Sequence, residues 1–145
     1  MSAGRICIRE VDTAAPDESA QVAAGRMHSR KVGTLIVVDK EQRPVGIVTD
    51  RDLTVRVLAQ GRDGGTTPVA EVMTAAPKTV SEETPIEDAL RLMRSGPFRR
   101  IPVVDSGGAL AGLLSLDDIL DLLAEEFAEI GRLIHSEDPA SLAGE

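Results

Sequence analysis

The sequence predicts a mixed α/β fold of two tandem βαββα units, packed pseudo-symmetrically and followed by a C-terminal helical extension. Three observations predict it: an internal repeat, the same order of strand-like and helix-like segments in each repeat, and hairpin strands that are apolar at consecutive positions. The predicted boundaries are 1–58 for the first unit, 59–69 for a linker rich in Gly, Thr and Pro, 70–124 for the second unit, and 125–145 for the extension.

The repeat relates residues that lie 66 positions apart, without a gap. This offset aligns Met27 with Met93, Val37 with Val103, Asp39 with Asp105, Gly46 with Gly112, Thr49 with Ser115, and Asp52 with Asp118. Chance supplies one or two such pairs but hardly this set, so we infer a duplication of about 60 residues per unit.

The first unit is expected to contain each element in the order strand, helix, hairpin, helix. ICI (6–8) is a weak first strand, and apolar residues at helical spacing predict a helix over roughly 17–30. GTLIVVD (33–39) and PVGIV (44–48) predict a hairpin across the turn KEQR. A second helix is expected to begin near Asp50.

The second unit repeats this order. PKTV (77–80) is a short β-prone run, and the next helix is expected to have Thr84 as its N-cap and to end at Gly96. RIPVVD (100–105) and ALAGLL (109–114) predict a hairpin, which a further helix follows. Consecutive apolar positions in the hairpins indicate that both sheet faces are covered, and helices must provide that cover.

The composition disfavours several classes of partner. The net charge of −8 argues against a nucleic-acid surface, which needs clustered Lys and Arg, and against an anionic membrane. A small anionic ligand stays compatible, because helix N-termini and one or two arginines can hold it locally. With two Phe and no Tyr or Trp, a bound base is expected to rest among aliphatic side chains instead of on ring faces.

The chain is expected to be cytoplasmic. Cys7 is the only cysteine, which excludes an intramolecular disulfide and fits a reducing cytosol. The first ten residues lack the apolar core of a signal peptide, and no apolar run approaches the length that spans a bilayer.

GIVTDRD (46–52) and GLLSLDD (112–118) share a glycine, a hydroxyl residue and an aspartate at matching positions. In a structural interpretation, the hydroxyl accepts from a backbone N–H at a strand-to-helix junction and the aspartate reaches back, forming a capping box. In a functional one, the junction offers N–H groups to phosphate, the glycine permits close approach, and the carboxylate accepts from ribose hydroxyls. The two are compatible, because one aspartate can cap the empty protein and bind ribose in the filled one.

The chain resembles a tandem pair of cystathionine-β-synthase (CBS) domains, known as a Bateman module. The resemblance rests on AEVMT (70–74), on RRIPVVD (99–105) and on the two motifs above, in this order, and it covers residues from about 5 to 125. It implies a stand-alone regulatory, energy-sensing protein whose ligand lies in clefts between the two domains. The implied ligand is AMP, ADP or ATP, with NAD or S-adenosylmethionine less favoured and Mg²⁺ present only with ATP.

The resemblance also implies roles for individual residues. It assigns ribose binding to Asp52 and Asp118, and ribose or phosphate contact to Thr49 and Ser115, beside the close-approach glycines Gly46 and Gly112. Phosphate would face Arg30 or Lys31 in the first unit and Arg99 or Arg100 in the second; an ordinary solvated charge is the alternative for each. The base would rest near Thr79, Val80, Ile101 and Pro102, with equivalents near Thr13, Leu35 and Ile36.

The two clefts are expected to be unequal, because the motifs differ beside the aspartate and because Lys31 has Pro97 as its repeat mate. The first motif carries Arg51 beside its aspartate, whereas the second carries Asp117, an extra carboxylate that disfavours phosphate. The first unit also lacks an opening that looks like AEVMT.

No catalytic set is found, so the chain is not expected to be an enzyme. His28 and His135 belong to no cluster with metal-ligand spacing, and neither a nucleophile elbow nor a P-loop occurs. The rival of the nucleotide sensor is a ligand-independent dimeric scaffold in which the motifs are only helix caps.

The last helix has apolar residues spaced 4, 3, 4, 3, 4, which is a heptad seam: Leu116, Leu120, Leu123, Phe127, Ile130 and Ile134. Either the tail folds back on its own unit, or it contacts another subunit. We favour a homodimer formed through the domain helices and through Phe127, Ile130 and Ile134, with an unidentified protein partner that receives the signal. The final residues PASLAGE (139–145) are expected to be disordered.

Overall fold

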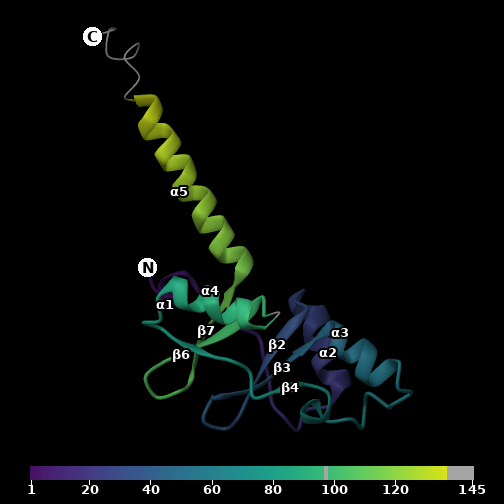
Figure 1. The fold of residues 1–145 in the computed structure, drawn as a ribbon. Helices are drawn as coiled ribbons and strands as arrows, with labels where there is room; N and C mark the ends of the chain where they lie inside the picture. Colours follow the sequence, from purple (N-terminus) through teal and green to yellow (C-terminus); the bar gives the residue numbers. More distant parts are fainter. Residues whose placement is uncertain (97, 137–145) are drawn as a thin grey trace.

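The computed structural model describes residues 1–96 and 98–136, so the predicted disordered tail at 139–145 lies outside the described residues. The first half contains α1 (Ala3–Ile6), β1 (Thr13–Ala14), α2 (Ala20–Arg30), β2 (Thr34–Val38), β3 (Pro44–Thr49), α3 (Asp50–Leu53) and the π-helix η1 (Thr54–Leu58). The second half contains the 3-10 helix η2 (Val69–Glu71), β4 (Thr74–Ala75), β5 (Val80–Ser81), α4 (Ile86–Ser95), β6 (Arg100–Val104), β7 (Leu110–Ser115) and α5 (Leu116–Ser136). The mixed α/β architecture with two sheets and a C-terminal helix is the predicted one (Figure 1).

Each unit has its own sheet, and the two sheets follow the same register. The orders are β1-β2-β3-β4 and β5-β6-β7, with the first strand of each unit parallel to the next one and the hairpins antiparallel. Val37 pairs with Gly46, and Val103 pairs with Gly112, so the pairing repeats with the same offset as the sequence. In both hairpins the register shifts after these valines, which places the same irregularity in each repeat.

The opening segment of each unit packs on the other unit. β4 pairs with β3 in the first sheet, while Ile8 pairs with Leu113 of β7 in the second. Matching backbone hydrogen bonds hold both segments: the amide of Gly4 donates to the carbonyl of Glu82 over 2.9 Å, and that of Ala70 to Pro16 over 2.9 Å. The two units are therefore tied together by exchanged segments.

This exchange corrects two expectations. ICI (6–8) is not the first strand of the first unit; that strand is β1, because residues 6–8 pair with the second sheet instead. The first unit also has an opening after all, since α1 occupies the place that η2 occupies in the second unit. Cys7 then stands where AEVMT has Met73.

The motif glycines make room for the sulfur side chains of the exchanged openings. A Cβ atom on Gly112 would lie 2.5 Å from Sγ of Cys7 and 2.8 Å from the carbonyl oxygen of Ile8. A Cβ atom on Gly46 would overlap the side chain of Met73. These glycines are therefore required by packing between the units. The sequence had suggested the close approach of a backbone or a ligand, and at Gly112 the backbone of Ile8 approaches.

The hydrophobic core has two parts, one for each sheet, and each contains residues from the other unit's opening. Val69 and Val72 are buried in the first core, and Ala3 and Cys7 in the second. Residues 35–38 of β2 are all buried, which confirms that both faces of the sheet are covered. Burial raises the pKa of the Cys7 thiol above its usual value, so this thiol stays protonated as a small apolar group.

α2 and α4 begin later than predicted, because of the hydrogen bonds that side chains make at their N-termini. α2 begins at Ala20, not near 17, because the hydroxyl of Ser19 accepts from the amide of Val22 over 3.1 Å. Thr84 is not an N-cap: its hydroxyl accepts from the amide of Ser81, and Pro85 occupies the cap position of α4. Gly96 ends α4 as expected.

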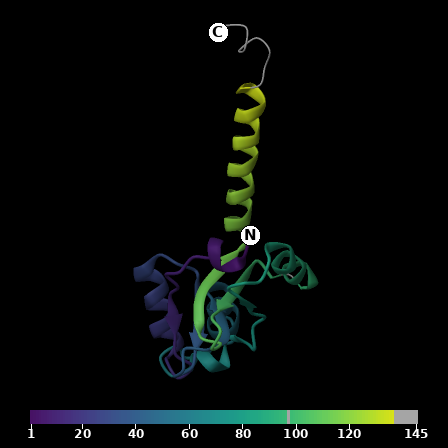
Figure 2. The same ribbon diagram turned by 90° about the vertical axis from the view of Figure 1, so that its left-hand side faces the viewer.

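α5 leaves the body of the molecule after its first turn. Leu116 and Ile119 pack against the second core, and the rest of the helix extends away from both units (Figures 1 and 2). The alternative in which the tail folds back on its own unit is therefore wrong. A continuous helix carries the tail outward instead of returning it to the sheet.

We expect Gly112→Ala to lower the free energy of unfolding by about 1–3 kcal/mol, since the new methyl group meets a backbone carbonyl that cannot move without breaking the pairing of Ile8. Gly46→Ala should cost less, because it meets only the flexible side chain of Met73. Urea unfolding followed by circular dichroism measures both. Gly25→Ala in α2, where nothing lies within 4 Å, is the control and should be neutral or stabilising. Equal losses at 46 and 112 would contradict the account.

Candidate functional site

The first motif forms a complete capping box at the junction of β3 and α3. Oγ1 of Thr49 accepts from the amide of Asp52 over 3.1 Å, and the amide of Thr49 donates to Oδ2 of Asp52 over 2.9 Å. The structural interpretation of GIVTDRD is therefore confirmed. The second oxygen, Oδ1 of Asp52, lies 3.8 Å from Nε of Arg56, too far for a hydrogen bond, and so keeps capacity to accept one.

The second motif forms only half of this arrangement. Oγ of Ser115 accepts from the amide of Asp118 over 3.1 Å. Oδ2 of Asp118 is buried and has no hydrogen-bond partner within residues 1–96 and 98–136. Because a buried carboxylate oxygen without a donor is unfavourable, this side chain is suited to accept from a hydroxyl group.

A cavity of about 390 Å³ lies between the two units beside Thr49 and Asp52, and we call it the Asp52 cleft. Small-molecule sites typically occupy roughly 300–1,000 Å³. The first unit supplies Thr34, Ile47, Thr49 and Asp52, and the second supplies Thr74, Pro77, Lys78, Phe98, Arg99, Arg100 and Ile101. The structure thus brings together five of the predicted residues: Thr49, Asp52, Arg99, Arg100 and Ile101.

The walls of the Asp52 cleft are more cationic than the sequence had indicated. Lys78, Arg99 and Arg100 face a single carboxylate, that of Asp52. Sequence analysis missed Lys78, which precedes the second unit's first strand. It also missed Phe98, whose aromatic side chain lines this cleft.

A second cavity, of about 330 Å³, is the repeat mate of the first, and we call it the Asp12 cleft. It is lined by Ile8, Glu10, Val11, Asp12, Lys31, Val32, Gly33, Thr34, Arg100 and Leu113. With the offset of 66, Asp12 stands where the Asp52 cleft has Lys78, and Gly33 where it has Arg99. This cleft is therefore lined by two carboxylates and two cations, and the carboxylate of Asp12 is also paired with Arg30.

The two clefts differ, as the sequence predicts, but for another reason. Asp117 is exposed and lines neither cleft, so the difference arises from Glu10 and Asp12 instead. Ser115 and Asp118 are also absent from both linings.

Arg100 and its mate Thr34 line both clefts, which places one guanidinium group between the two cavities. Arg100 cannot donate its full set of hydrogen bonds to phosphate groups on both sides at once. Arg100 is therefore shared between the two clefts.

The other predicted residues lie elsewhere. Lys31 lines the Asp12 cleft, whereas Arg30 donates from Nε to Asp12 over 2.8 Å as an exposed ion pair. Val80 and Pro102 are buried core residues, and Thr79 is exposed outside both clefts. The proposed equivalents Leu35 and Ile36 are fully buried too.

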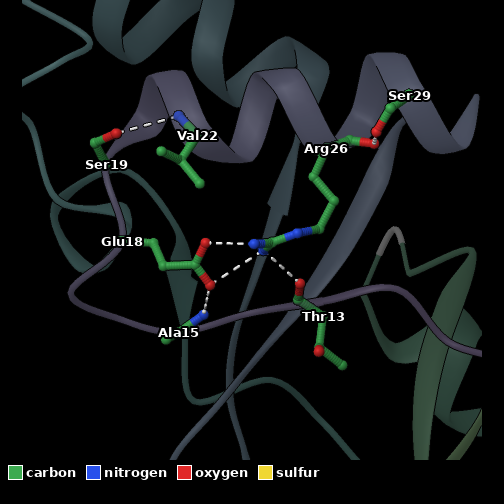
Figure 3. A network of polar contacts seen from close by, with 7 residues as sticks. All are labelled: Thr13, Ala15, Glu18, Ser19, Val22, Arg26 and Ser29. Atoms are coloured by element: carbon green, nitrogen blue, oxygen red, sulfur yellow. Dashed lines mark hydrogen bonds and ion pairs between the residues drawn. The ribbon is translucent and has the colours of Figure 1, made fainter.

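A third cavity, of about 720 Å³, lies beside β1, and a polar network lines it instead of the motif residues (Figure 3). The guanidinium group of Arg26 donates to both carboxylate oxygens of Glu18, over 3.1 and 2.6 Å, and to the carbonyl of Thr13 over 2.8 Å. The hydrogen bond from Arg26 holds the pKa of Glu18 below its usual value, with a further contribution from the amide of Ala15.

This third cavity is a poor phosphate site. Its lining includes the carboxylates of Asp12, Asp17, Glu18 and Asp39, but only two cationic side chains. One of these, Arg26, is already engaged by Glu18. The network joins α2 to β1 and stabilises the first unit.

Residues 1–96 and 98–136 contain no group of three or more His, Cys, Asp and Glu side chains that could hold a metal ion. None of their helices is both long enough and apolar enough to span a membrane.

Comparison with known proteins gives consistent matches. A model described as the CBS domain matches residues 3–59 and again residues 69–125. An uncharacterized protein of Methanopyrus kandleri is 33% identical over 122 residues, which cover 84% of this chain and 62% of that protein. The chain therefore spans less than two thirds of that relative.

Two solved structures resemble the whole body of the molecule. The crystal structure of CBSX2 in complex with AMP has a TM-score of 0.72 and 30% identity, with 86% of this chain and 96% of that one covered; CBSX2 comes from Arabidopsis thaliana. A hexameric CBS-CP12 protein from bloom-forming cyanobacteria has a TM-score of 0.71 and 35% identity, with 83% and 69% covered.

We expect Glu18→Gln to lower the free energy of unfolding at pH 7 by about 1–2 kcal/mol, since the charged hydrogen bonds to Arg26 are lost. A depressed folded-state pKa contributes stability above the unfolded value near 4.5, and this contribution disappears as the pH falls through the folded value. The gap between wild type and variant should therefore close in acid. Urea unfolding at pH 7 and pH 3 measures it, with exposed Glu83→Gln as control. A gap of equal size at both values would show that charge plays no part.

Proposed function

This chain belongs to the CBS domain family, and on that premise we propose that it is a regulatory protein that binds an adenine nucleotide in the Asp52 cleft and transmits its occupancy to a partner protein. One observation carries the proposal. A carboxylate with spare accepting capacity and three cationic side chains converge on a cavity of about 390 Å³ between the two units. Such a cavity suits a ligand with hydroxyl groups at one end and phosphate at the other.

The ribose end of the ligand is assigned to Asp52. Its side chain is only 17% exposed, and its Oδ2 is held by the amide of Thr49, so the orientation of the carboxylate is fixed before a ligand arrives. Oδ1 is then the acceptor for a ribose hydroxyl. The cap and the ligand site use different oxygens of one carboxylate, which makes the structural and functional interpretations compatible.

The phosphate end is assigned to Arg99, Arg100 and Lys78. Arginine suits phosphate because its planar fork can donate two parallel hydrogen bonds, and lysine adds a point charge. All three side chains come from the second unit, while Asp52 belongs to the first. A bound nucleotide would therefore bridge the units, and its presence could alter their spacing, which is the signal proposed to reach a partner.

AMP is the ligand we favour among AMP, ADP and ATP. A protein with 30% identity and the same fold forms a complex with AMP. Three cations against one carboxylate also suit a single doubly charged phosphate. NAD and S-adenosylmethionine are weaker candidates. Mg²⁺ would enter only as the companion of ATP.

The Asp12 cleft is proposed to be the weaker site for a phosphate ligand. Its lining has two carboxylates, Glu10 and Asp12, beside two cations, Lys31 and Arg100, whereas the Asp52 cleft has one carboxylate beside three cations. Arg100 is also engaged when the Asp52 cleft holds phosphate. We therefore expect one tightly bound AMP per chain, since the second cleft loses its shared cation to the first.

A ligand-independent scaffold is the second candidate function. The complete capping box at Thr49 and Asp52 favours it, because that box accounts for these residues without any ligand. The capping box does not account for three cations around the same cavity. No catalytic group is proposed in either case.

We expect Asp52→Asn to weaken AMP binding by about tenfold or more, since a charge-assisted hydrogen bond contributes about 1.5–3 kcal/mol, while Asn remains able to cap the helix. Titration calorimetry with AMP, and thermal unfolding of the free protein, measure the two effects. Asp118→Asn is the matched control and should change the main AMP affinity little. If unfolding shifts strongly at Asp52→Asn while affinity is unchanged, the residue is only a cap. If AMP, ATP, NAD and S-adenosylmethionine all fail to bind wild type, the scaffold is correct.

We expect Arg99→Ala to weaken AMP binding about tenfold and to leave adenosine binding unchanged, because adenosine lacks the phosphate group that Arg99 contacts. Competition between AMP and adenosine in the same calorimeter measures the difference. Arg94→Ala, at an exposed position of α4 outside both clefts, should alter neither affinity. An equal loss for AMP and adenosine would place Arg99 away from the phosphate.

A further inference from the structure

The exposed part of α5 carries one apolar stripe, which we define as Leu120, Leu123, Phe127, Ile130 and Ile134. Their side chains are between 41% and 72% exposed. Leu133, at 59%, lies beside them. Isolated exposed apolar residues are ordinary, but a continuous row of this size on one soluble helix requires a covering surface. In the described part of the chain nothing covers it, because the helix extends away from both units (Figures 1 and 2).

We propose that the stripe is covered by the same stripe of a second copy of this chain, so that two α5 helices pair as a short coiled coil. Spacings of 3 and 4 in alternation keep the stripe on one side of a supercoiled helix, and a partner helix must have the same 3.5-residue period. A second copy has that period by definition. This inference does not rest on nucleotide binding.

The charge distribution on α5 permits self-association in spite of the acidity of the chain. The e and g positions of the heptad repeat flank the stripe. They hold Ala124, Glu126, Gly131 and Leu133, so only one of these four residues is charged. Asp121, Glu125 and Glu129 lie at outward positions. Two copies can therefore approach without placing rows of carboxylates against each other.

The area is sufficient for a dimer. The five side chains of the stripe and Leu133, each burying on the order of 100 Å², would remove about 1,200 Å² from water in the pair, which is the lower bound of stable interfaces. The helix also needs the contact. Within the described residues, only the first turns of α5 pack on the core, and most helical stability in proteins comes from the packing of an apolar face.

The test is sedimentation velocity of the full chain over a wide concentration range, with wild type expected to be a dimer. The double variant Phe127→Ser with Ile130→Ser should raise the dimer dissociation constant about a hundredfold or more, because four buried side chains are lost per dimer. Asp121→Ser with Glu125→Ser, on the outward face of the same helix, should leave it unchanged. Phe127→Leu with Ile130→Leu should preserve dimers, which separates apolar contact from a general effect on folding.

Helix content provides a second readout. Circular dichroism of wild type should show helix content that rises with protein concentration, and the serine variant should lose that dependence while its thermal unfolding remains cooperative. A wild type that is monomeric at every concentration would overturn the proposal. So would a serine variant that stays fully dimeric, because another surface, such as exposed Leu58 on η1, would then carry the association.

Discussion

The exchange of opening segments between the two units is the constraint on which the rest of the structure depends. Ile8 and Leu113 exchange two backbone hydrogen bonds of 2.9 Å, and β4 pairs with β3 in the same way on the other side. Cys7 and Met73 then enter the spaces left by Gly112 and Gly46. Because β4 pairs with the first sheet and Ile8 bridges to the second, the sheets cannot separate without losing paired backbone groups. This coupling fixes the position of the walls of both clefts, which makes a preformed small-molecule site possible.

The two clefts have matching backbones because of the duplication, but the side chains that line them differ. The register of the hairpins and the hydrogen bonds of the openings repeat with one offset, so the two cavities have comparable volumes. At matching positions, the Asp52 cleft has Lys78 and Arg99 where the other cleft has Asp12 and Gly33. These differences change the charge of the cleft and leave its backbone arrangement the same. Thr74 of β4 lines the cationic cleft, so this cleft lies against one of the exchanged segments that hold the fold.

The sequence predicted the local elements and the family, and it missed what depends on distant pairing. Hairpins and helices follow from apolar spacing within a few residues, which is why β2 with β3 and β6 with β7 were found. The place of Ile8 depends on a partner more than a hundred residues away, although the offset of 66 already matched Cys7 with Met73 and was an available signal. Of the predicted site residues, Thr49, Asp52, Arg99, Arg100 and Ile101 converge. Val80 and Pro102 do not line the cleft, since their side chains are buried in the core. Lys78 lines the cleft, but no sequence motif indicated it.

The central claim, that the Asp52 cleft is the nucleotide site, is tested most directly by a crystal structure of the protein grown with AMP. The account predicts one nucleotide per chain, with ribose hydroxyls donating to Asp52 and phosphate oxygens accepting from Arg99, Arg100 or Lys78. It would be contradicted by an empty Asp52 cleft at saturating AMP. A nucleotide bound in the Asp12 cleft or beside Glu18, with the Asp52 cleft unoccupied, would contradict it equally.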